Sequence, residues 1–189
     1  HQGWVVMFQH GGVILRKLRR EDLPTLLDLK SESWETTHHV TIANMEDQER
    51  WFDSLDDNVH TPRNLMLMAH SPKVVKPFGI YKISEIDWAN RNCFAAWDVF
   101  KEFRGKKLGK PLVIAGTAFC FHVLNLWRVG CEILETNIAS QKCAEAAGFQ
   151  REGLKRESVA KLGKYLNSGV YGVLEREFSA LQAVPNQVH

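Results

Sequence analysis

A short basic loop with two glycines, set between an apolar stretch and an amphipathic helix, most constrains how this chain can fold. Its sequence runs Val99-Phe-Lys-Glu-Phe-Arg104-Gly105-Lys-Lys107-Leu108-Gly109-Lys110-Pro111-Leu112. Glycine lets the backbone approach a ligand closely, and the free N–H groups and positive dipole end of the helix's first turn would face that ligand. Proline is tolerated in a first helical turn, so Pro111 predicts a helix that begins near Lys107 or Leu108. This order of apolar stretch, basic glycine-containing loop and helix predicts an anion-binding site, although an ordinary strand-to-helix connection can have the same composition.

A second strand, turn and helix follow this helix along the chain. Residues 129–134 form a predicted strand, and Thr136 or Asn137 is placed to cap a short alanine-rich helix. Gly148 would end that helix in the left-handed conformation.

Five motifs are spaced along the chain: Arg104-x-x-x-x-Gly109, Asn137-x-x-Ser140, Ala147-Gly148-Phe149-x-x-Glu152-Gly153, Gly163-Lys164-Tyr165 and Tyr171-Gly-Val-Leu-x-x-Glu177. In this order they resemble the GCN5-related N-acetyltransferases, from about Val13 to Glu177. The branch that they resemble most holds the ribosomal-protein N-terminal, spermidine and amino-sugar-nucleotide acetyltransferases. The family's loop usually has a glycine where this chain has Lys107, which can still offer its backbone N–H if its φ is negative.

The resemblance implies an α/β (α+β) fold, in which a mixed, mostly antiparallel central sheet with a splay carries helices on both faces. We expect a single domain over residues 13–178, a disordered or expression-derived N-terminus over residues 1–12, and a C-terminal tail over residues 179–189. A chain of 189 residues, 44% of them hydrophobic, has room for one buried core. The expected strands are 13–18, 64–70, 77–84, 92–100, 128–134, 148–158 and 168–178, and the expected helices are 20–33, 45–55, 107–124 and 139–147.

Composition and spacing argue against several other functions. No run of eighteen apolar residues predicts a membrane span, and the basic clusters 16–20 and 106–107 lack the interleaved aromatic residues of a nucleic-acid-binding surface. The four cysteines show no C-x-x-C spacing, which predicts buried free thiols and hence a reducing, cytoplasmic location. The adjacent His38 and His39 would point to opposite sides of a strand, so we expect no metal site.

The resemblance implies that the protein binds acetyl-CoA, needs no metal and transfers an acetyl group to an amine. Such a transfer needs a clamp for the pyrophosphate, a backbone edge for the pantetheine arm, and a group that takes a proton from the amine. The strand end at Val99 and Phe100 would hydrogen-bond the pantetheine where the sheet splays open. The other residues implied for the cofactor are Arg104, Gly105, Lys106, Lys107, Leu108, Gly109 and Lys110 in the loop, and Asn137 and Ser140, which also suit helix capping.

Two acids are candidates for the general base. Glu132 lies five residues before Asn137, which resembles the position of the base in N-terminal alanine acetyltransferases; the alternative is a solvent-facing or salt-bridged glutamate on a strand. Asp98 lies in an otherwise apolar strand beside the expected acetyl site, where a carboxylate must be paired or reach a cavity; the alternative is a structural pair with an arginine. Many relatives use a tyrosine as general acid where this chain has Ala144, so we assign no general acid.

The acceptor pocket is expected between the segment that follows the first helix and the last hairpin, with Trp34, His38, His39 and Tyr165 as its contacts. These side chains suit a polar ring or a peptide terminus, whereas a polyamine calls for an acidic pocket that a pI near 8.4 does not indicate. We expect acetylation of a small-molecule primary amine, with an amino-sugar nucleotide ahead of other acceptors. The alternatives are a protein N-terminal acetyltransferase, which takes a peptide N-terminus, and a non-catalytic acyl-CoA-binding module. A homodimer is compatible with each.

Overall fold

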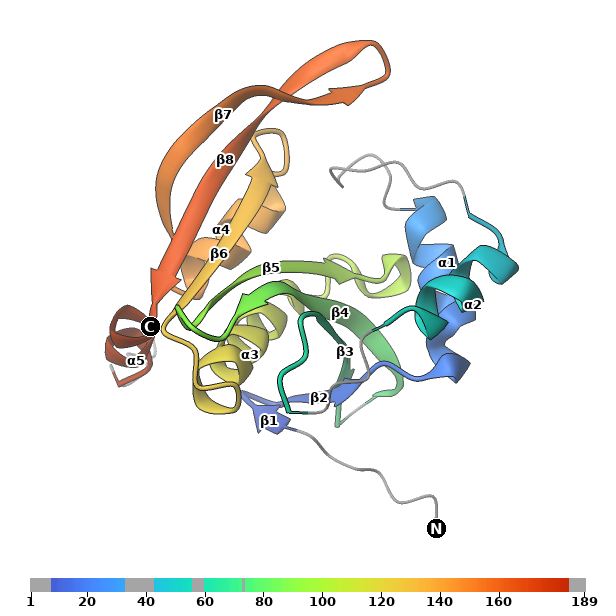
Figure 1. The fold of residues 1–189 in the computed structure, drawn as a ribbon, viewed down its shortest axis with the longest axis horizontal. Helices are drawn as coiled ribbons and strands as arrows, with labels where there is room; N and C mark the ends of the chain where they lie inside the picture. The colour runs from blue at the N-terminus through green and yellow to red at the C-terminus, as the bar shows by residue number, and fades with distance from the viewer. Residues whose placement is uncertain (1–7, 33–42, 56–59, 73, 184–189) are drawn as a thin grey trace.

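The computed structural model describes residues 8–32, 43–55, 60–72 and 74–183, and within them the chain builds one eight-stranded sheet (Figure 1). The strand order is β1-β2-β3-β4-β5-β6-β8-β7, and only the β5–β6 pair is parallel. The strands are β1 (Phe8–His10), β2 (Val13–Lys17), β3 (Leu65–Ser71), β4 (Val74–Asp87), β5 (Asn92–Val99), β6 (Arg128–Leu134), β7 (Gln150–Lys161) and β8 (Lys164–Leu174). The α-helices are α1 (Leu23–Glu32), α2 (Met45–Asp53), α3 (Gly109–His122), α4 (Ile138–Ala146) and α5 (Glu175–Ala183), with 3-10 turns η1 (Arg20–Asp22) and η2 (Lys101–Phe103).

The predicted mixed sheet and the predicted order of its elements are confirmed, with two additions at the ends. Phe8 begins a strand inside the segment 1–12 that we expected to be disordered, because its ring packs edge-on against Phe119 of α3. The last strand ends at Leu174, not at residue 178, and helix α5 takes up part of the expected tail. Glu177 accepts a hydrogen bond from the backbone N–H of Leu174, which supports the first turn of that helix, and Phe178 is fully buried.

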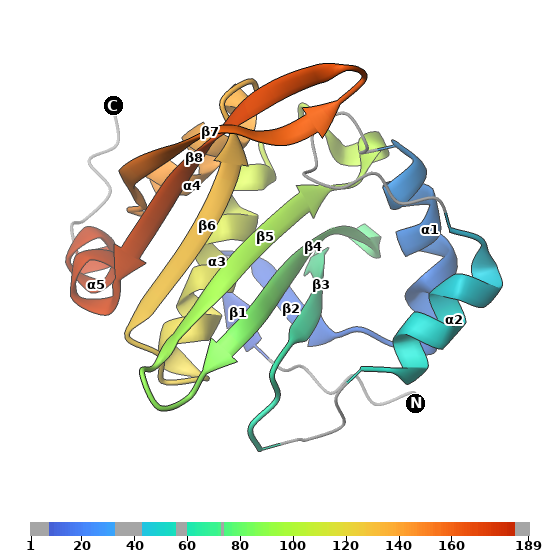
Figure 2. The same cartoon turned by 45° about the horizontal axis from the view of Figure 1, so that its top comes forward.

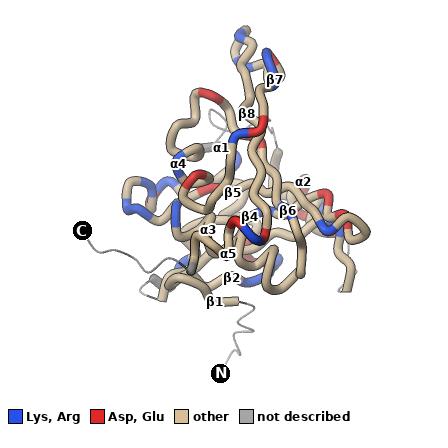
Figure 3. The backbone as a smooth tube through the Cα atoms, turned by 90° about the vertical axis from the view of Figure 1, so that its left-hand side faces the viewer, with Lys and Arg blue, Asp and Glu red and all other residues tan. Residues whose placement is uncertain are grey.

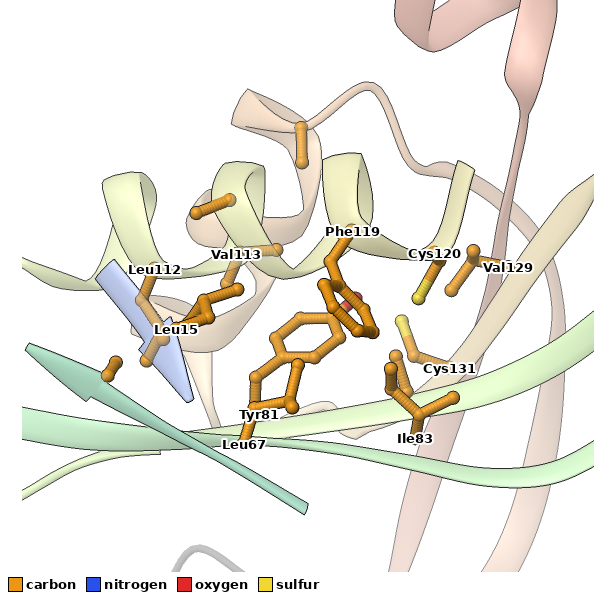
Figure 4. Close-up of a cluster of buried hydrophobic side chains, with 14 of the residues drawn as sticks. Leu15, Leu67, Tyr81, Ile83, Leu112, Val113, Phe119, Cys120, Val129 and Cys131 are labelled. Atoms are coloured by element: carbon orange, nitrogen blue, oxygen red, sulfur yellow. The ribbon is translucent and has the colours of Figure 1, made fainter. Parts of the chain in front are cut away.

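Helix α3 packs across one face of the sheet and forms the main core with it (Figure 4). Tyr81 of β4 lies under the helix, fully buried, and its hydroxyl is 3.2 Å from the hydroxyl of Thr117. A Cβ atom at Gly116 would lie 2.2 Å from the Tyr81 ring, so only glycine allows this approach. Burial raises the pKa of the Tyr81 hydroxyl well above its usual range, so this group stays neutral in the core.

Helices α1 and α2 lie at the β2–β4 side of the sheet (Figure 2). A buried network ties this part together: Arg16 of β2 makes two 2.7 Å hydrogen bonds to Asp22 of η1 and donates through Nε to His70 of β3 at 3.0 Å. Since an unpaired charge would be costly to bury, these residues hold the start of α1 against the sheet.

The hairpin β7–β8 extends beyond the rest of the sheet. Residues 128–134 of β6 pair with residues 168–174 of β8, so residues 164–166 pair only with β7. Charged residues of both signs lie along β7 (Figure 3). Arg128 of β6 reaches across Gly172 of β8 and forms a bidentate ion pair with Glu152 of β7. A Cβ atom at residue 172 would clash with both side chains.

Candidate acetyl-transfer site

Strands β5 and β6 separate halfway along their length. They pair only where residues 92–94 of β5 meet residues 128–130 of β6, while β5 stays bound to β4 as far as Val99 and β6 stays bound to β8 as far as Leu134. The hydrogen bond from the N–H of Phe100 to the carbonyl of Phe78 sets the register of the β4–β5 ladder. Because backbone groups alternate in direction along a strand, the N–H of Val99 faces away from β4 and into the gap. The expected splay is therefore present, with Val99 at its edge.

The loop that leads to α3 presents several backbone N–H groups without an internal acceptor. Gly105 has a φ of 77°, and the N-cap residue Leu108 provides no side-chain cap. Among the described residues, the backbone N–H groups of 107–110 donate no hydrogen bond, since the first backbone bond of the helix runs from Leu112 to Leu108. A left-handed residue followed by a right-handed one, as at Lys107 and Leu108, forms a concave N–H surface suited to an anion.

The structure corrects two details of the expected loop. Lys107 has a φ of 60°, not a negative φ, so it occupies the conformation that the missing glycine would favour. The helix begins at Gly109, one or two residues later than expected, and a Cβ atom there would lie 2.8 Å from the sulfur of Cys143. Gly109 thus allows the close contact between α3 and α4 at Cys143.

Arg104 turns back onto the end of β5. Its Nε donates to the carbonyl of Val99 at 3.0 Å, and its Nη2 lies 3.4 Å from Oδ1 of Asp98. The N–H of Phe100 is bound by Phe78 and its carbonyl accepts from Phe103, so the main chain of Phe100 is already used within the protein. Of the two residues expected to meet pantetheine, Val99 alone keeps an N–H that points into the splay.

Trp97 supplies a buried donor in the same stretch of β5. Its ring stacks on Tyr81 at 6.1 Å between centroids and packs on Phe149 at 5.9 Å, yet its indole N–H has no partner within the described residues. A buried N–H without an acceptor is rare because it loses its hydrogen bond to water. The amide and thioester carbonyls of acetyl-CoA could accept a hydrogen bond from the indole N–H of Trp97. This part of β5 therefore fits the cofactor.

Asp98 and Glu132 lie on the same face of the sheet, on opposite sides of the splay. Phe94 of β5 pairs in parallel with Gly130 of β6, so residues 96 and 98 share a face with residue 132. Each carboxylate has a basic neighbour, Arg104 for Asp98 and Lys155 for Glu132, and the side chains are 18% and 27% exposed. The two alternatives stated for these acids, an arginine pair for Asp98 and a salt bridge for Glu132, are therefore both present. Both acids lie beside the splay, where the amine would react.

Helix α4 contributes a cap next to this site. The side chain of Asn137 accepts a hydrogen bond from the backbone N–H of Ser140 at 3.1 Å, which confirms its expected capping role, and Gly148 ends the helix with a φ of 86°. Ala144 is fully buried at the position of the missing tyrosine. The neighbouring thiol of Cys143 is half-buried, which raises its pKa, and all four cysteines are free, as predicted.

Of the four expected acceptor contacts, the structure describes Tyr165. Trp34, His38 and His39 lie outside the described residues. Tyr165 is 69% exposed on the projecting part of the β7–β8 hairpin. The sequence analysis did not single out Lys82, which pairs with Ala96 of β5 and lines a cavity together with residues of α2. The alternation of buried and exposed residues along β4 could have indicated that Lys82 lies on the open face of the sheet.

Within residues 8–32, 43–55, 60–72 and 74–183, no three His, Cys, Asp or Glu side chains gather as metal ligands would. None of the helices in that part of the chain has the length and apolar character needed to span a membrane.

Comparison with known proteins agrees with this geometry. Residues 13–150 match the family model of the acetyltransferase (GNAT) domain. The uncharacterized N-acetyltransferase p20 of Bacillus licheniformis is 23% identical over 170 residues, which cover 87% of this chain and 94% of that protein. The probable N-acetyltransferase YjcK of Bacillus subtilis is 26% identical over 106 residues, which cover 56% and 58%. The crystal structure of a spermidine N-acetyltransferase from Vibrio cholerae in complex with CoA and spermine has a TM-score of 0.81 at 18% identity, covering 90% of this chain and 99% of that one.

The family model spans most of the chain and includes the splayed strands, the N–H loop and α4. The chain belongs to the GNAT family of N-acetyltransferases.

Proposed function

We propose that this enzyme transfers the acetyl group of acetyl-CoA to a primary amine of a small molecule at the splay between β5 and β6. The observation that carries the proposal is the juxtaposition of the uncapped N–H groups at 107–110 with the unpaired edge of β5 at Val99, which Arg104 ties together. The loop would hold the pyrophosphate and its lysines would balance the charge. Val99 would then align the pantetheine arm along the strand.

Proton removal is assigned to Glu132. Acetyl-CoA supplies a thioester, and an ammonium group cannot attack it until a proton is lost. Glu132 lies beside the splay on the face opposite α3, is partly open to solvent, and could take the proton directly or through water. Asp98 is the second candidate, and it is more enclosed and held by Arg104.

The acceptor that we favour is an amino-sugar nucleotide. The Vibrio cholerae structure holds spermine, a polycation, whereas Lys82 on this chain's open face is a basic residue. A protein N-terminus is the alternative, and it would need room for a peptide beside the splay.

A thiol-release assay tests the proposal. The protein is incubated with acetyl-CoA and a panel of amino-sugar nucleotides, polyamines and N-terminal peptides, and free CoA is measured against a control without amine. We expect release with the amino-sugar nucleotides. Release confined to peptides would show that the acceptor class is wrong, and no release with any amine, despite a rise in Tm with acetyl-CoA, would overturn acetyl transfer to these amines.

A further inference from the structure

A cavity of about 70 Å³ lies between α2 and the open face of the sheet. Its walls combine aromatic and aliphatic side chains with basic ones, and none of the described residues that line it is a carboxylate. The residues that matter here are Trp51, Phe52, Leu55, Met66, Lys17 and Lys82. A pocket with apolar walls and basic groups at its rim suits a ligand that has both an apolar or ring-shaped part and a negative charge.

A second ammonium group, that of Lys30, lies over the Trp51 ring that lines this cavity. Lys30 of α1 donates to Oε1 of Gln48 at 2.7 Å, and its Nζ lies 5.1 Å from the centre of the Trp51 ring. Burial, and next the positive charge of Lys82, lower the pKa of Lys30. Gln48 and the Trp51 ring are both neutral, so they position the charge of Lys30 without cancelling it.

Neither lysine has a counter-ion within the described part of the chain. The ion pairs of that part involve other residues, although the protein carries 22 acidic side chains. Gln48 is 1% exposed, and its Nε2 is a buried donor with no acceptor among the residues that the structure describes. The positive charges of Lys30 and Lys82 repel each other, and the Gln48 amide that holds Lys30 has an unsatisfied donor, so a bound anion would relieve the charge repulsion.

The cavity is placed to reach the reaction centre. Lys82 pairs with Ala96 of β5 and therefore shares a face with Asp98. With strands about 4.8 Å apart and about 3.3 Å per residue, Lys82 lies roughly 10 Å from the splay edge at Val99. A single small molecule can span that distance, with its amine at the splay.

We propose that the acceptor amine carries an anionic group, a phosphate or a carboxylate, that binds between Lys30 and Lys82 beside the Trp51 ring. This inference rests on the proposed acetyl transfer and narrows its substrate class: a polyamine is excluded by charge repulsion, and a neutral amine lacks the group that the lysines bind.

Acceptor pairs that differ only in charge test the proposal. Glucosamine 6-phosphate is compared with glucosamine, and phenylalanine with phenylalaninamide, which separates a phosphate from a carboxylate. In the thiol-release assay we expect kcat/KM to be about ten- to a hundredfold higher for one of the anionic partners, as for a charge-assisted hydrogen bond. Equal use of both members of each pair, or a preference for spermidine, would overturn the proposal.

Variants place the anionic group at the lysines. Lys82→Met should raise the KM for the anionic acceptor about tenfold or more and leave the KM for acetyl-CoA unchanged, and Lys82→Arg should restore most of the loss. Lys142→Gln, which removes an exposed lysine on α4, is the matched control and should change neither value. An equal loss for the anionic and neutral acceptors in Lys82→Met would contradict the assigned role.

Binding without turnover separates this inference from the proposed function. The Tm is measured with glucosamine 6-phosphate alone, with phenylalanine alone and with inorganic phosphate, in the wild-type protein and in Lys30→Gln and Lys82→Met. A rise in Tm that the two substitutions abolish supports the anion site even if no amine is acetylated. No rise with any probe overturns the site, even if acetyl transfer to a neutral amine is observed.

Discussion

The two faces of the central sheet have opposite character, although the same strands form both. On the face under α3, residues from β4, β5 and β6 are at most 6% exposed: Tyr81, Ile83, Cys93, Ala95, Val129, Cys131 and Ile133. On the other face, the residues between them include Lys82, Phe94, Asp98 and Glu132, which are charged or at least partly exposed. The alternation of side chains along a strand therefore places most of the packing on one face and the two carboxylates on the other, with Trp97 as the residue of the α3 face that also suits the cofactor.

From this difference we infer that the stability and the activity of the protein can be altered independently. The α3 face supplies the buried apolar area that stabilises the fold, while the open face and the splay hold groups whose loss leaves that area intact. Substitutions on the two faces should separate Tm from kcat, and each of the following experiments can break that rule.

The largest effect is expected at Glu132, on the open face. Glu132→Gln should lower kcat by about 10²- to 10⁴-fold, as for the loss of a general base, with an unchanged KM for acetyl-CoA. Steady-state kinetics at saturating acetyl-CoA measures this. Lys155→Met removes the ion-pair partner and keeps the acid, so its kcat should change only a few-fold. If Glu132→Gln keeps full activity, the base is Asp98 or water.

The next effect is expected at Gly116, under α3. Gly116→Ala drives a methyl group into the Tyr81 ring and should destabilise the protein by about 2 kcal/mol, even though alanine favours the helix. Thermal unfolding should show a Tm lower by roughly 4–8 °C, since about 1 kcal/mol corresponds to 2–4 °C at this size. Gly153→Ala is the matched control, because nothing lies within 4 Å of a Cβ atom there. A wild-type Tm for Gly116→Ala would contradict the packing of Tyr81.

The loop at the border of the two faces should affect cofactor binding. Gly105→Asp places a carboxylate among the N–H groups, while Gly105→Asn keeps the size and the tolerance of positive φ without the charge. Acetyl-CoA at about 100 times its Kd stabilises a protein by about 2.7 kcal/mol, and the aspartate variant should lose most of this gain while the asparagine variant keeps it. Gly105 is preferable to Gly109, where a side chain would strike Cys143. Equal Tm shifts in both variants would argue against an anion site in the loop.

The smallest effect is expected at Trp97. Trp97→Phe keeps an aromatic ring against Tyr81 and Phe149 but removes the indole N–H, so the KM for acetyl-CoA should rise about fivefold, the value of one hydrogen bond. The kcat should stay within a factor of two. Trp97→Leu, which also removes the stacking, should in addition lower the Tm; a KM that changes only together with the Tm would assign Trp97 to packing.

Local patterns determined much of this protein. The glycines and Pro111 marked the start of α3 to within two residues, Asn137 marked its cap on α4, and Gly148 marked a left-handed end, because each depends on the conformational preferences of a few neighbouring residues. Strand β1 and helix α5, which the sequence analysis did not predict, had no such local marker. Strand β1 depends on Phe119 more than a hundred residues away, and α5 on the buried Phe178.

Contacts between residues that are far apart in sequence became known from the tertiary structure. It placed Cys143 against Gly109, Lys155 against Glu132, and Trp51 and Lys82 on the walls of one cavity, and the members of each pair are far apart in sequence. The physical reason is that conformational preference acts over a few residues, whereas ion pairs, close packing and cavities depend on the strand order and register that bring remote segments together.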